Sequence, residues 1–265
     1  MNSDKTEPAV KLTKDGSTTL FSSLFNQYYH NPNGAVAESR HVFFETTNLA
    51  GLLRSDKPLT IFETGFGTGL NLVLCLDYIR QSLRKIPVTF KSVEAYPIKA
   101  QTARDLSFGS ESFLNKQVPV LAEIFDGLKP GMNQAGINPL LKLELFWGKF
   151  EDTPDFSENH IADKNLASFI LHDPFSPDVN PGLWTPDVFK QLYQISTSDA
   201  ILATYCAATS ARAAMAVANW NVARARGALG KREMTIASKS AEKLLTFKRL
   251  NENRLKERFE KGDFG

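Results

Sequence analysis

One segment, residues 59–84, constrains the fold of this chain more than any other. Residues 59–63 (LTIFE) form a short apolar run that stops at Gly65, Gly67 and Gly69, which is typical of a buried parallel strand. Residues 70–84 then place apolar side chains at helical spacing. A strand, a glycine-rich turn and a helix predict a nucleotide-type ligand site, because glycine lets a ligand approach the backbone and the helix start offers N–H donors. The simpler alternative is a strand-to-helix turn without a ligand.

The rest of the chain alternates strands and helices, which indicates a parallel α/β sheet. We expect a helix after Pro97, and residues 107–140 read as an irregular insertion. Two final strands follow each other without a helix, so they predict an antiparallel hairpin at the sheet edge. The expected strands are 88–93, 141–146, 166–172, 200–205, 222–226 and 232–238, and the expected helices are 36–53, 184–196, 210–219 and 242–260.

Composition excludes several classes of protein. The chain has 265 residues, 42% hydrophobic and 23% charged, as in an ordinary globular protein. Cys75 and Cys206 lack zinc-ligand spacing, so we expect reduced, buried thiols and no metal site. The first residues carry no apolar stretch, and no run approaches the ~18 apolar residues of a membrane span. We therefore expect a cytoplasmic protein without a signal peptide.

Charge is unevenly distributed along the chain. The net charge of +2 is too small to imply a polyanionic partner by itself. Residues 224–265, however, hold twelve Lys or Arg against six Asp or Glu, a local excess of six positive charges. This tail is either a solvated basic surface or a surface that contacts phosphates.

The glycine spacing favours one cofactor class. Dinucleotide folds use G-x-G-x-x-G, whereas here the third glycine arrives one residue early. The acidic residue Glu63 followed by G-x-G-x-G resembles motif I of class I S-adenosylmethionine methyltransferases. Glu94, at the end of the second strand, would hold the ribose hydroxyls, since a carboxylate accepts two hydrogen bonds. The resemblance implies that S-adenosylmethionine is bound by Glu63, Gly65, Phe66, Gly67, Gly69, Asn71 and Glu94.

The adenine end of the cofactor site departs from this pattern. Many such enzymes have Gly-Asp after the third strand, with the Asp accepting a hydrogen bond from adenine. This chain has Lys149 at that position, and lysine has no acceptor. Glu151, Asp152 or a backbone carbonyl are the alternatives.

A second motif follows the fourth strand. Asp173 stands at the carboxyl end of a buried strand, where open α/β sheets place ligand-handling groups. Asp173-Pro174-Phe175 resembles the Asp/Asn-Pro-Pro-Tyr/Phe loops of amino-group methyltransferases. A carboxylate can orient an acceptor amine and take its proton, and an aromatic side chain favours a nearby cation. We therefore predict Asp173 and Phe175 as catalytic residues, with a loop-forming or helix-capping Asp173 as the alternative.

Several motifs together resemble one family, the MnmC-type tRNA 5-methylaminomethyl-2-thiouridine methyltransferases. The resemblance covers roughly residues 19–238 and implies a stand-alone methyltransferase domain without the family's oxidase domain. It rests on G-A-x-x-E-S-R-H-V-F at 34–43, E-T-G-F-G-T-G-L-N at 63–71, D-x-F-x-P with N-P-x-x-W at 173–184, and G-x-x-G-K-R-E at 227–233.

The resemblance implies both a fold and a division of the chain. The fold would be Rossmann-like, a seven-stranded, mostly parallel sheet with an antiparallel edge hairpin and an N-terminal cap. Residues 1–56 would form the N-terminal extension and cap, residues 57–238 the methyltransferase domain, and residues 239–265 a basic C-terminal tail.

The resemblance also implies a substrate. The reaction would be N-methylation of 5-aminomethyl-(2-thio)uridine at the tRNA wobble position, with the base taken out of the anticodon loop. Arg40 and His41 would contact the substrate, and Lys231 and Arg232 would meet phosphates, although a core histidine and a solvated strand end are equally good interpretations. A separate enzyme would supply the aminomethyl group, and we expect a monomer. The alternatives are an amino-group methyltransferase acting on a small molecule or protein, and an inactive cofactor-binding module.

Overall fold

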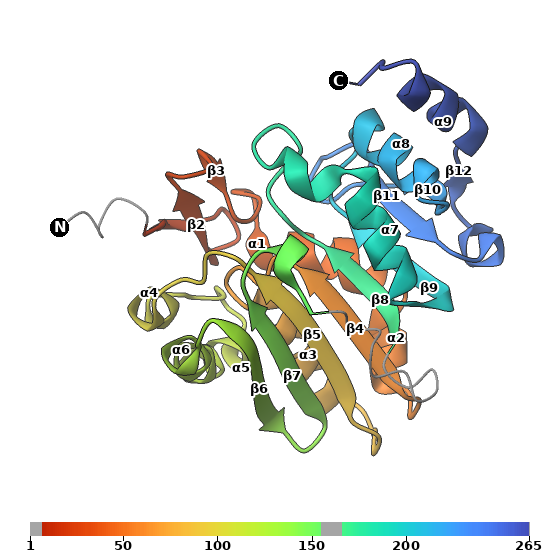
Figure 1. The fold of residues 1–265 in the computed structure, drawn as a ribbon. Helices are drawn as coiled ribbons and strands as arrows, with labels where there is room; N and C mark the ends of the chain where they lie inside the picture. Colours follow the sequence, from red (N-terminus) through yellow and green to blue (C-terminus); the bar gives the residue numbers. More distant parts are fainter. Residues whose placement is uncertain (1–6, 155–165, 265) are drawn as a thin grey trace.

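The computed structural model describes residues 7–154 and 166–264, and its centre is one mixed β-sheet (Figure 1). The strand order is β12-β10-β11-β9-β8-β4-β5-β7-β6. Strands β7, β5, β4, β8 and β9 are parallel, while β6, β11, β10 and β12 run antiparallel to their neighbours. The bounds are β4 Leu59–Thr64, β5 Val88–Glu94, β6 Gly131–Asn138, β7 Leu141–Trp147, β8 Ala167–His172, β9 Ser196–Thr204, β10 Asn221–Ala225, β11 Met234–Ser238 and β12 Lys248–Arg249.

Helices cover both faces of this sheet. Side chains of a strand alternate between faces, and in β4 Ile61 packs into one core cluster and Phe62 into the other. The first cluster lies under α2 (Leu49–Arg54), α3 (Leu70–Arg80), α4 (Ala100–Arg104), α5 (Ser112–Asn115) and α6 (Val118–Gly127). The second lies under α7 (Pro186–Gln194), α8 (Thr209–Val217) and α9 (Glu252–Glu260). Burial on both faces explains why the central strands are continuous apolar runs.

A small N-terminal sheet stands beside the large one (Figure 1). It consists of β1 (Ala9–Leu12), β2 (Thr18–Ser22) and β3 (Gln27–Tyr28), in antiparallel order β1-β2-β3. The chain then enters α1 (Ala35–Ser39) and a single π-helical segment, η1 (Arg40–Glu45), before α2. Asn48 has φ 60° at the start of α2, so the continuous helix predicted for residues 36–53 is wrong: the chain turns there.

Two other predictions about the sheet need correction. The sheet has nine strands rather than seven, because the supposed insertion at 107–140 contains α5, α6 and the edge strand β6. The helix predicted over residues 242–260 is confirmed only in its second half. Its first half forms the 3-10 turn η4 (Ala241–Leu244) and the short strand β12, which pairs with β10. The division at residues 56 and 238 stays a prediction.

Several connections lie near the carboxyl ends of the parallel strands. Two of them contain 3-10 turns, η2 (Phe150–Asp152) after β7 and η3 (Pro181–Trp184) after β8. Thr185 caps α7 with its side chain, which accepts a hydrogen bond from the Val188 N–H. Within the described residues, no helix is both long and apolar enough to cross a membrane.

Candidate active site

The carboxyl ends of the central parallel strands open into one cavity of about 300 Å³. β8, β4 and β5 are neighbours in the sheet, so the loops that follow them meet at one edge. The cavity is lined by Gly65 and Gly67 after β4, by Glu94 at the end of β5, and by Asp173 after β8. The structure therefore brings together residues that the sequence placed in three separate motifs.

The glycine loop and Glu94 are bonded to each other. The Gly67 N–H donates to Glu94 Oε2 at 2.8 Å, and the Tyr96 N–H donates to Oε1 at 2.7 Å. Gly65 and Gly67 have φ of 88° and 56°, a region in which other residues are strained. Burial raises the pKa of the Glu94 carboxyl. The loop and the strand end thus form one rigid wall of the cavity.

Four of the seven predicted cofactor residues do not line the cavity: Glu63, Phe66, Gly69 and Asn71. Phe66 is 3% exposed and packs against Phe125, with ring centroids 5.6 Å apart. A Cβ on Gly69 would lie 2.5 Å from Leu121 Cδ2, and Gly69 has φ 77°. Gly69 therefore allows α3 to start against α6, and Phe66 belongs to the core. The predicted contacts of Phe66 and Gly69 with the cofactor are not supported by this geometry.

Behind the cavity, one asparagine joins two carboxylates. Asn71 Nδ2 donates to Glu63 Oε1 at 2.9 Å and to Asp173 Oδ2 at 3.3 Å. The other oxygen of Glu63 accepts a hydrogen bond from Ser92 Oγ at 2.8 Å. The pKa of the Glu63 carboxyl is raised well above its usual range, and burial is the main cause. Glu63 is 1% exposed and absent from the cavity wall, so it supports Asn71 and does not reach a ligand.

Asp173 lines the cavity next to the glycine loop, where a Cβ on Gly65 would lie 3.2 Å from the Asp173 carbonyl oxygen. Its backbone N–H donates to Thr64 O at 3.1 Å, which fixes the start of the loop against β4. Burial raises the pKa of the Asp173 carboxyl well above its usual range, and the charge of Glu38 raises it further. A buried carboxylate with a raised pKa is a stronger base than an exposed one.

Aromatic side chains close the cavity beside Asp173. Phe175 stacks on Phe25 with centroids 4.4 Å apart and meets Tyr29 edge-on at 5.0 Å. The Trp184 indole N–H donates to Phe175 O at 2.8 Å, and Trp184 is 5% exposed. Trp184 therefore anchors the loop and does not offer a stacking surface, whereas Phe175 does line the cavity.

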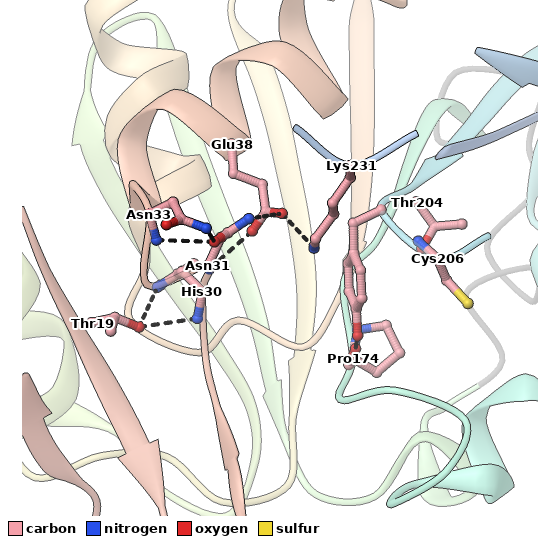
Figure 2. Close-up of polar contacts among 10 residues, drawn as sticks. Thr19, His30, Asn31, Asn33, Glu38, Pro174, Thr204, Cys206 and Lys231 are labelled. Carbon is pink, nitrogen blue, oxygen red and sulfur yellow. Dashed lines mark hydrogen bonds and ion pairs between the residues drawn. The ribbon is translucent and has the colours of Figure 1, made fainter. Parts of the chain in front are cut away.

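The N-terminal segment supplies a wall that the sequence motifs did not point to. Phe25, Gln27, Tyr29 and Glu38 line the cavity, and Gln27 Oε1 accepts a hydrogen bond from Ser176 Oγ at 3.0 Å. Figure 2 shows Glu38 between Asn31 and Lys231. Glu38 belongs to the 34–43 motif, which marked the segment but not this role.

The four predicted substrate contacts separate into two groups. Arg40 binds Asp77 Oδ2 at 3.0 Å and Glu111 Oε2 at 3.2 Å, and His41 Nε2 lies 2.8 Å from Arg226 O. Neither lines the cavity, so their predicted contact with substrate is not supported. Lys231 does line the cavity, although its Nζ is paired with Glu38 at 2.7 Å.

A second hollow adjoins the cavity. Arg232 lies in it together with Arg224 and Glu233, and Lys231 and Tyr205 line both hollows. Arg224 is paired with Glu233 at 2.7 Å. The position of Arg232 is compatible with a phosphate contact beside the cavity.

The loop after β7 bears on which group would accept a hydrogen bond from adenine. Lys149 Nζ pairs with Glu151 Oε1 at 3.3 Å, and both side chains are exposed. The cavity is lined instead by their neighbours Gly148 and Phe150. Of the alternatives, the geometry favours a backbone group of this loop.

The chain is similar to one family model and to curated proteins of one name. Residues 141–240 match a family model described as S-adenosyl-L-methionine-dependent methyltransferase. A "tRNA 5-methylaminomethyl-2-thiouridine biosynthesis bifunctional protein MnmC" from Ralstonia nicotianae is 34% identical over 231 residues, 86% of this chain and 34% of that protein. The protein of the same name from Burkholderia thailandensis is 29% identical over 240 residues, 88% of this chain and 35% of that protein. The chain thus spans about a third of the length of the curated relatives it matches.

A solved structure shares the fold. The crystal structure of MNMC2 from Aquifex aeolicus superposes with a TM-score of 0.72 and 24% identity, covering 97% of this chain and 77% of that one. The residues matched by the family model, 141–240, include the Asp173 loop and the strands β10 and β11. By its sequence, the chain belongs to the MnmC-type family of S-adenosyl-L-methionine-dependent methyltransferases.

Proposed function

We propose that this chain transfers a methyl group from S-adenosylmethionine to the exocyclic amine of 5-aminomethyl-(2-thio)uridine at the wobble position of tRNA. One observation carries the proposal: the glycine loop and the Asp173 carboxylate line the same cavity. A cofactor on the loop and an amine beside Asp173 would therefore share one enclosed space. The relatives' printed names, which concern tRNA 5-methylaminomethyl-2-thiouridine, support the choice of amine.

The residues present fit the cofactor. Glu94 is fixed by two backbone N–H groups and lines the cavity, so its free lone pairs suit ribose hydroxyls. Gly65 and Gly67 have no side chains, so the loop presents only its backbone to the cavity at these two positions. When bound, the cofactor supplies an electrophilic methyl group on a sulfonium. The phenyl ring of Phe150 and the Gly148 backbone lie where the base of the cofactor would be held.

The charge of the cavity suits cationic ligands. Among the described residues that line it, Glu38, Glu94 and Asp173 carry carboxylates, and Lys231 is the only lysine or arginine. A cavity with an excess of negative charge attracts cations, and both the sulfonium and an incoming ammonium are cations. The aromatic rings of Phe25, Tyr29 and Phe175 add favourable quadrupoles.

Asp173 would act on the acceptor amine. An alkylamine enters mostly as an ammonium, which has no free lone pair. Transfer of one N–H proton to an Asp173 oxygen frees that lone pair for attack on the methyl group. The raised pKa of Asp173 makes it a better proton acceptor. Placing the two reactants side by side supplies much of the remaining acceleration.

The nucleic-acid part of the proposal follows from geometry. The cavity holds only about 300 Å³, so the wobble base would have to leave the anticodon stack to enter it. Anticodon loops are single-stranded, which keeps the cost of unstacking low. Arg232 and the basic tail would then meet the phosphate backbone. We further propose that a separate enzyme supplies the aminomethyl group, and that the chain works as a monomer in the cytoplasm.

The test uses the purified chain, labelled S-adenosylmethionine, and tRNA bearing unmethylated 5-aminomethyl-2-thiouridine. We expect label in the wobble nucleoside, identified after nuclease digestion, and its loss in Asp173→Asn by about a hundredfold or more. The control is that Asp173→Asn still binds S-adenosylhomocysteine. Cofactor binding without transfer to this tRNA, or transfer only to a small amine or a protein, would contradict the proposed substrate.

A further inference from the structure

An ion pair joins two distant segments at the edge of the cavity. Lys231 Nζ lies 2.7 Å from Glu38 Oε1, across 193 residues of sequence. Glu38 comes from α1, and Lys231 from the turn between β10 and β11. Figure 2 shows both side chains reaching toward each other. Both line the cavity that also holds Asp173.

The two partners are held in place by further contacts. Glu38 is 8% exposed and accepts hydrogen bonds from the Asn31 backbone N–H at 3.0 Å and from Asn31 Nδ2 at 3.3 Å. Lys231 Nζ lies over the Tyr205 ring, 5.0 Å from its centroid. Tyr205 in turn donates its hydroxyl to Pro174 O at 2.8 Å, next to Asp173. These contacts hold both charges at the cavity that Asp173 also lines.

We propose that Glu38 and Lys231 are positioning residues whose ion pair controls, with opposite signs, how readily Asp173 takes up the proton of the acceptor amine. A nearby negative charge favours the protonated form of a carboxyl, and a nearby positive charge favours the ionised form. Glu38 and Lys231 influence Asp173 in these two directions. This inference rests on the proposed function and deepens it.

Other titratable groups around Asp173 are less suited to this control. Glu63 on β4 shares the Asn71 amide with Asp173 and also interacts with its charge, but Glu63 does not line the cavity. Glu94 on β5 is tied to the glycine loop. His172, adjacent in sequence on β8, is fully buried, and burial lowers its pKa to about 3, so it stays neutral. Burial and the Asp173 charge raise the pKa of Tyr205, so it stays neutral too. Glu38 and Lys231 are therefore the two oppositely charged residues that act on the protonation of Asp173.

The first experiment measures kcat/KM against pH with the aminomethyl-uridine tRNA. Activity requires ionised Asp173, so the acidic limb follows its pKa. Lys231→Met leaves Glu38 uncompensated, and the limb should move up by about one pH unit. Glu38→Gln leaves Lys231 unopposed, and the limb should move down by a similar amount. The double variant should return close to the wild type, and Lys231→Arg, which keeps the charge, should not move it.

The matched control is Lys142→Met. Lys142 makes an ion pair with Glu144 at 2.8 Å, and neither residue lines the cavity. It should leave the pH profile unchanged. The proposal would be overturned if the acidic limb of the kcat/KM profile did not move in Lys231→Met and Glu38→Gln. It would also be overturned if the limb moved in the same direction in both variants.

A second measurement does not depend on the substrate. Protein labelled with ¹³C at the aspartate carboxyl carbon gives a titration curve for Asp173 by NMR, identified by its absence in Asp173→Asn. The midpoint should rise in Lys231→Met and fall in Glu38→Gln. An inactive wild type with these opposite movements would sink the proposed function and leave this inference standing. An active wild type in which the Asp173 midpoint does not move in these opposite directions would overturn this inference and leave the proposed function standing. If Glu38→Gln fails to fold, Lys231→Met and Lys231→Arg decide the matter alone.

Discussion

The side-chain amide of Asn71 donates a hydrogen bond to the Asp173 carboxylate at 3.3 Å, across 102 residues of sequence. Asn71 lies in the first turn of α3, directly after the glycine loop. The residue therefore connects the part of the chain proposed to hold the cofactor with the part proposed to take the proton. Its second bond, to Glu63 at 2.9 Å, fixes the amide so that it cannot rotate away.

We expect Asn71→Ala to lower kcat/KM by about tenfold or more, because a hydrogen bond to a charged group contributes about 1.5–3 kcal/mol. Without this donor the Asp173 pKa rises, so the acidic limb of the pH profile moves up. Steady-state kinetics between pH 6 and 9 would measure both effects. Ser92→Ala removes a donor to Glu63 only and is the matched control. Equal losses in the two variants would mean that Asn71 acts through Glu63 and not through Asp173.

Glu94→Gln should weaken cofactor binding by about tenfold or more. Both Glu94 oxygens accept backbone N–H groups, from Gly67 and Tyr96, and the amide –NH₂ of glutamine cannot accept either. Calorimetric titration with S-adenosylhomocysteine measures the change. Glu144→Gln, on β7 and paired with Lys142, should bind as the wild type does. Unchanged affinity in Glu94→Gln would remove Glu94 from the cofactor site.

Gly69→Ala should destabilise the fold by about 1–3 kcal/mol. The residue has φ 77°, and its new Cβ would lie 2.5 Å from Leu121 Cδ2. Urea unfolding measures the difference in the free energy of unfolding. Gly127→Ala, where no atom lies within 4 Å of the new Cβ, serves as the control and should be neutral or stabilising. A neutral Gly69→Ala would show that the start of α3 relaxes freely.

The stability of the protein should fall in mild acid, partly because of His172. Its pKa is lowered to about 3 by burial, against ~6.5 in the unfolded chain. Between these values the unfolded state binds more protons, so stability is lost as pH falls. From pH 7.5 to 5.0 the loss from this one group is about 2 kcal/mol.

The measurement compares urea unfolding of the wild type and His172→Phe at the two pH values. Other buried groups titrate in both proteins, so only the difference between them reports on His172. His172 packs against Trp184 and Phe189, where a phenyl ring replaces the imidazole at similar volume. The variant should lose about 2 kcal/mol less than the wild type on acidification. Parallel losses would show that the imidazole is protonated in the folded state.

The central strands and the β10–β11 hairpin were predictable, whereas the outermost strands β6 and β12 were not. β4, β5 and β8 are buried on both faces, so their sequences are apolar runs with a clear end. β6 is an edge strand of small and polar residues, GMNQAGIN, without a buried face. Such a strand is held by its pairing with β7, and pairing leaves no signal in the strand's own residues.

The site shows the same contrast. Glu94 and Asp173 stand at the ends of buried strands, and that position, together with the motif resemblance, was enough to predict them. Glu38 is one acidic residue in a short helix, and its partner Lys231 lies 193 residues away. Arg40 and His41 were predicted to meet substrate, but their partners, Asp77 and the Arg226 carbonyl, lie 37 and 185 residues away in sequence. Nothing local distinguishes a structural arginine from one that binds a ligand.

The wall formed by Phe25, Gln27, Tyr29 and Glu38 precedes every strand of the nine-stranded sheet in sequence. The groups proposed to hold the cofactor, in contrast, belong to that sheet and to the loop after β4. This wall and the proposed cofactor site are thus encoded in separate stretches of the gene. We expect substitutions in the first forty codons to alter this side of the cavity while the glycine loop and Glu94 stay untouched, which gives evolution, or a library designer, a short region in which to search for new acceptors.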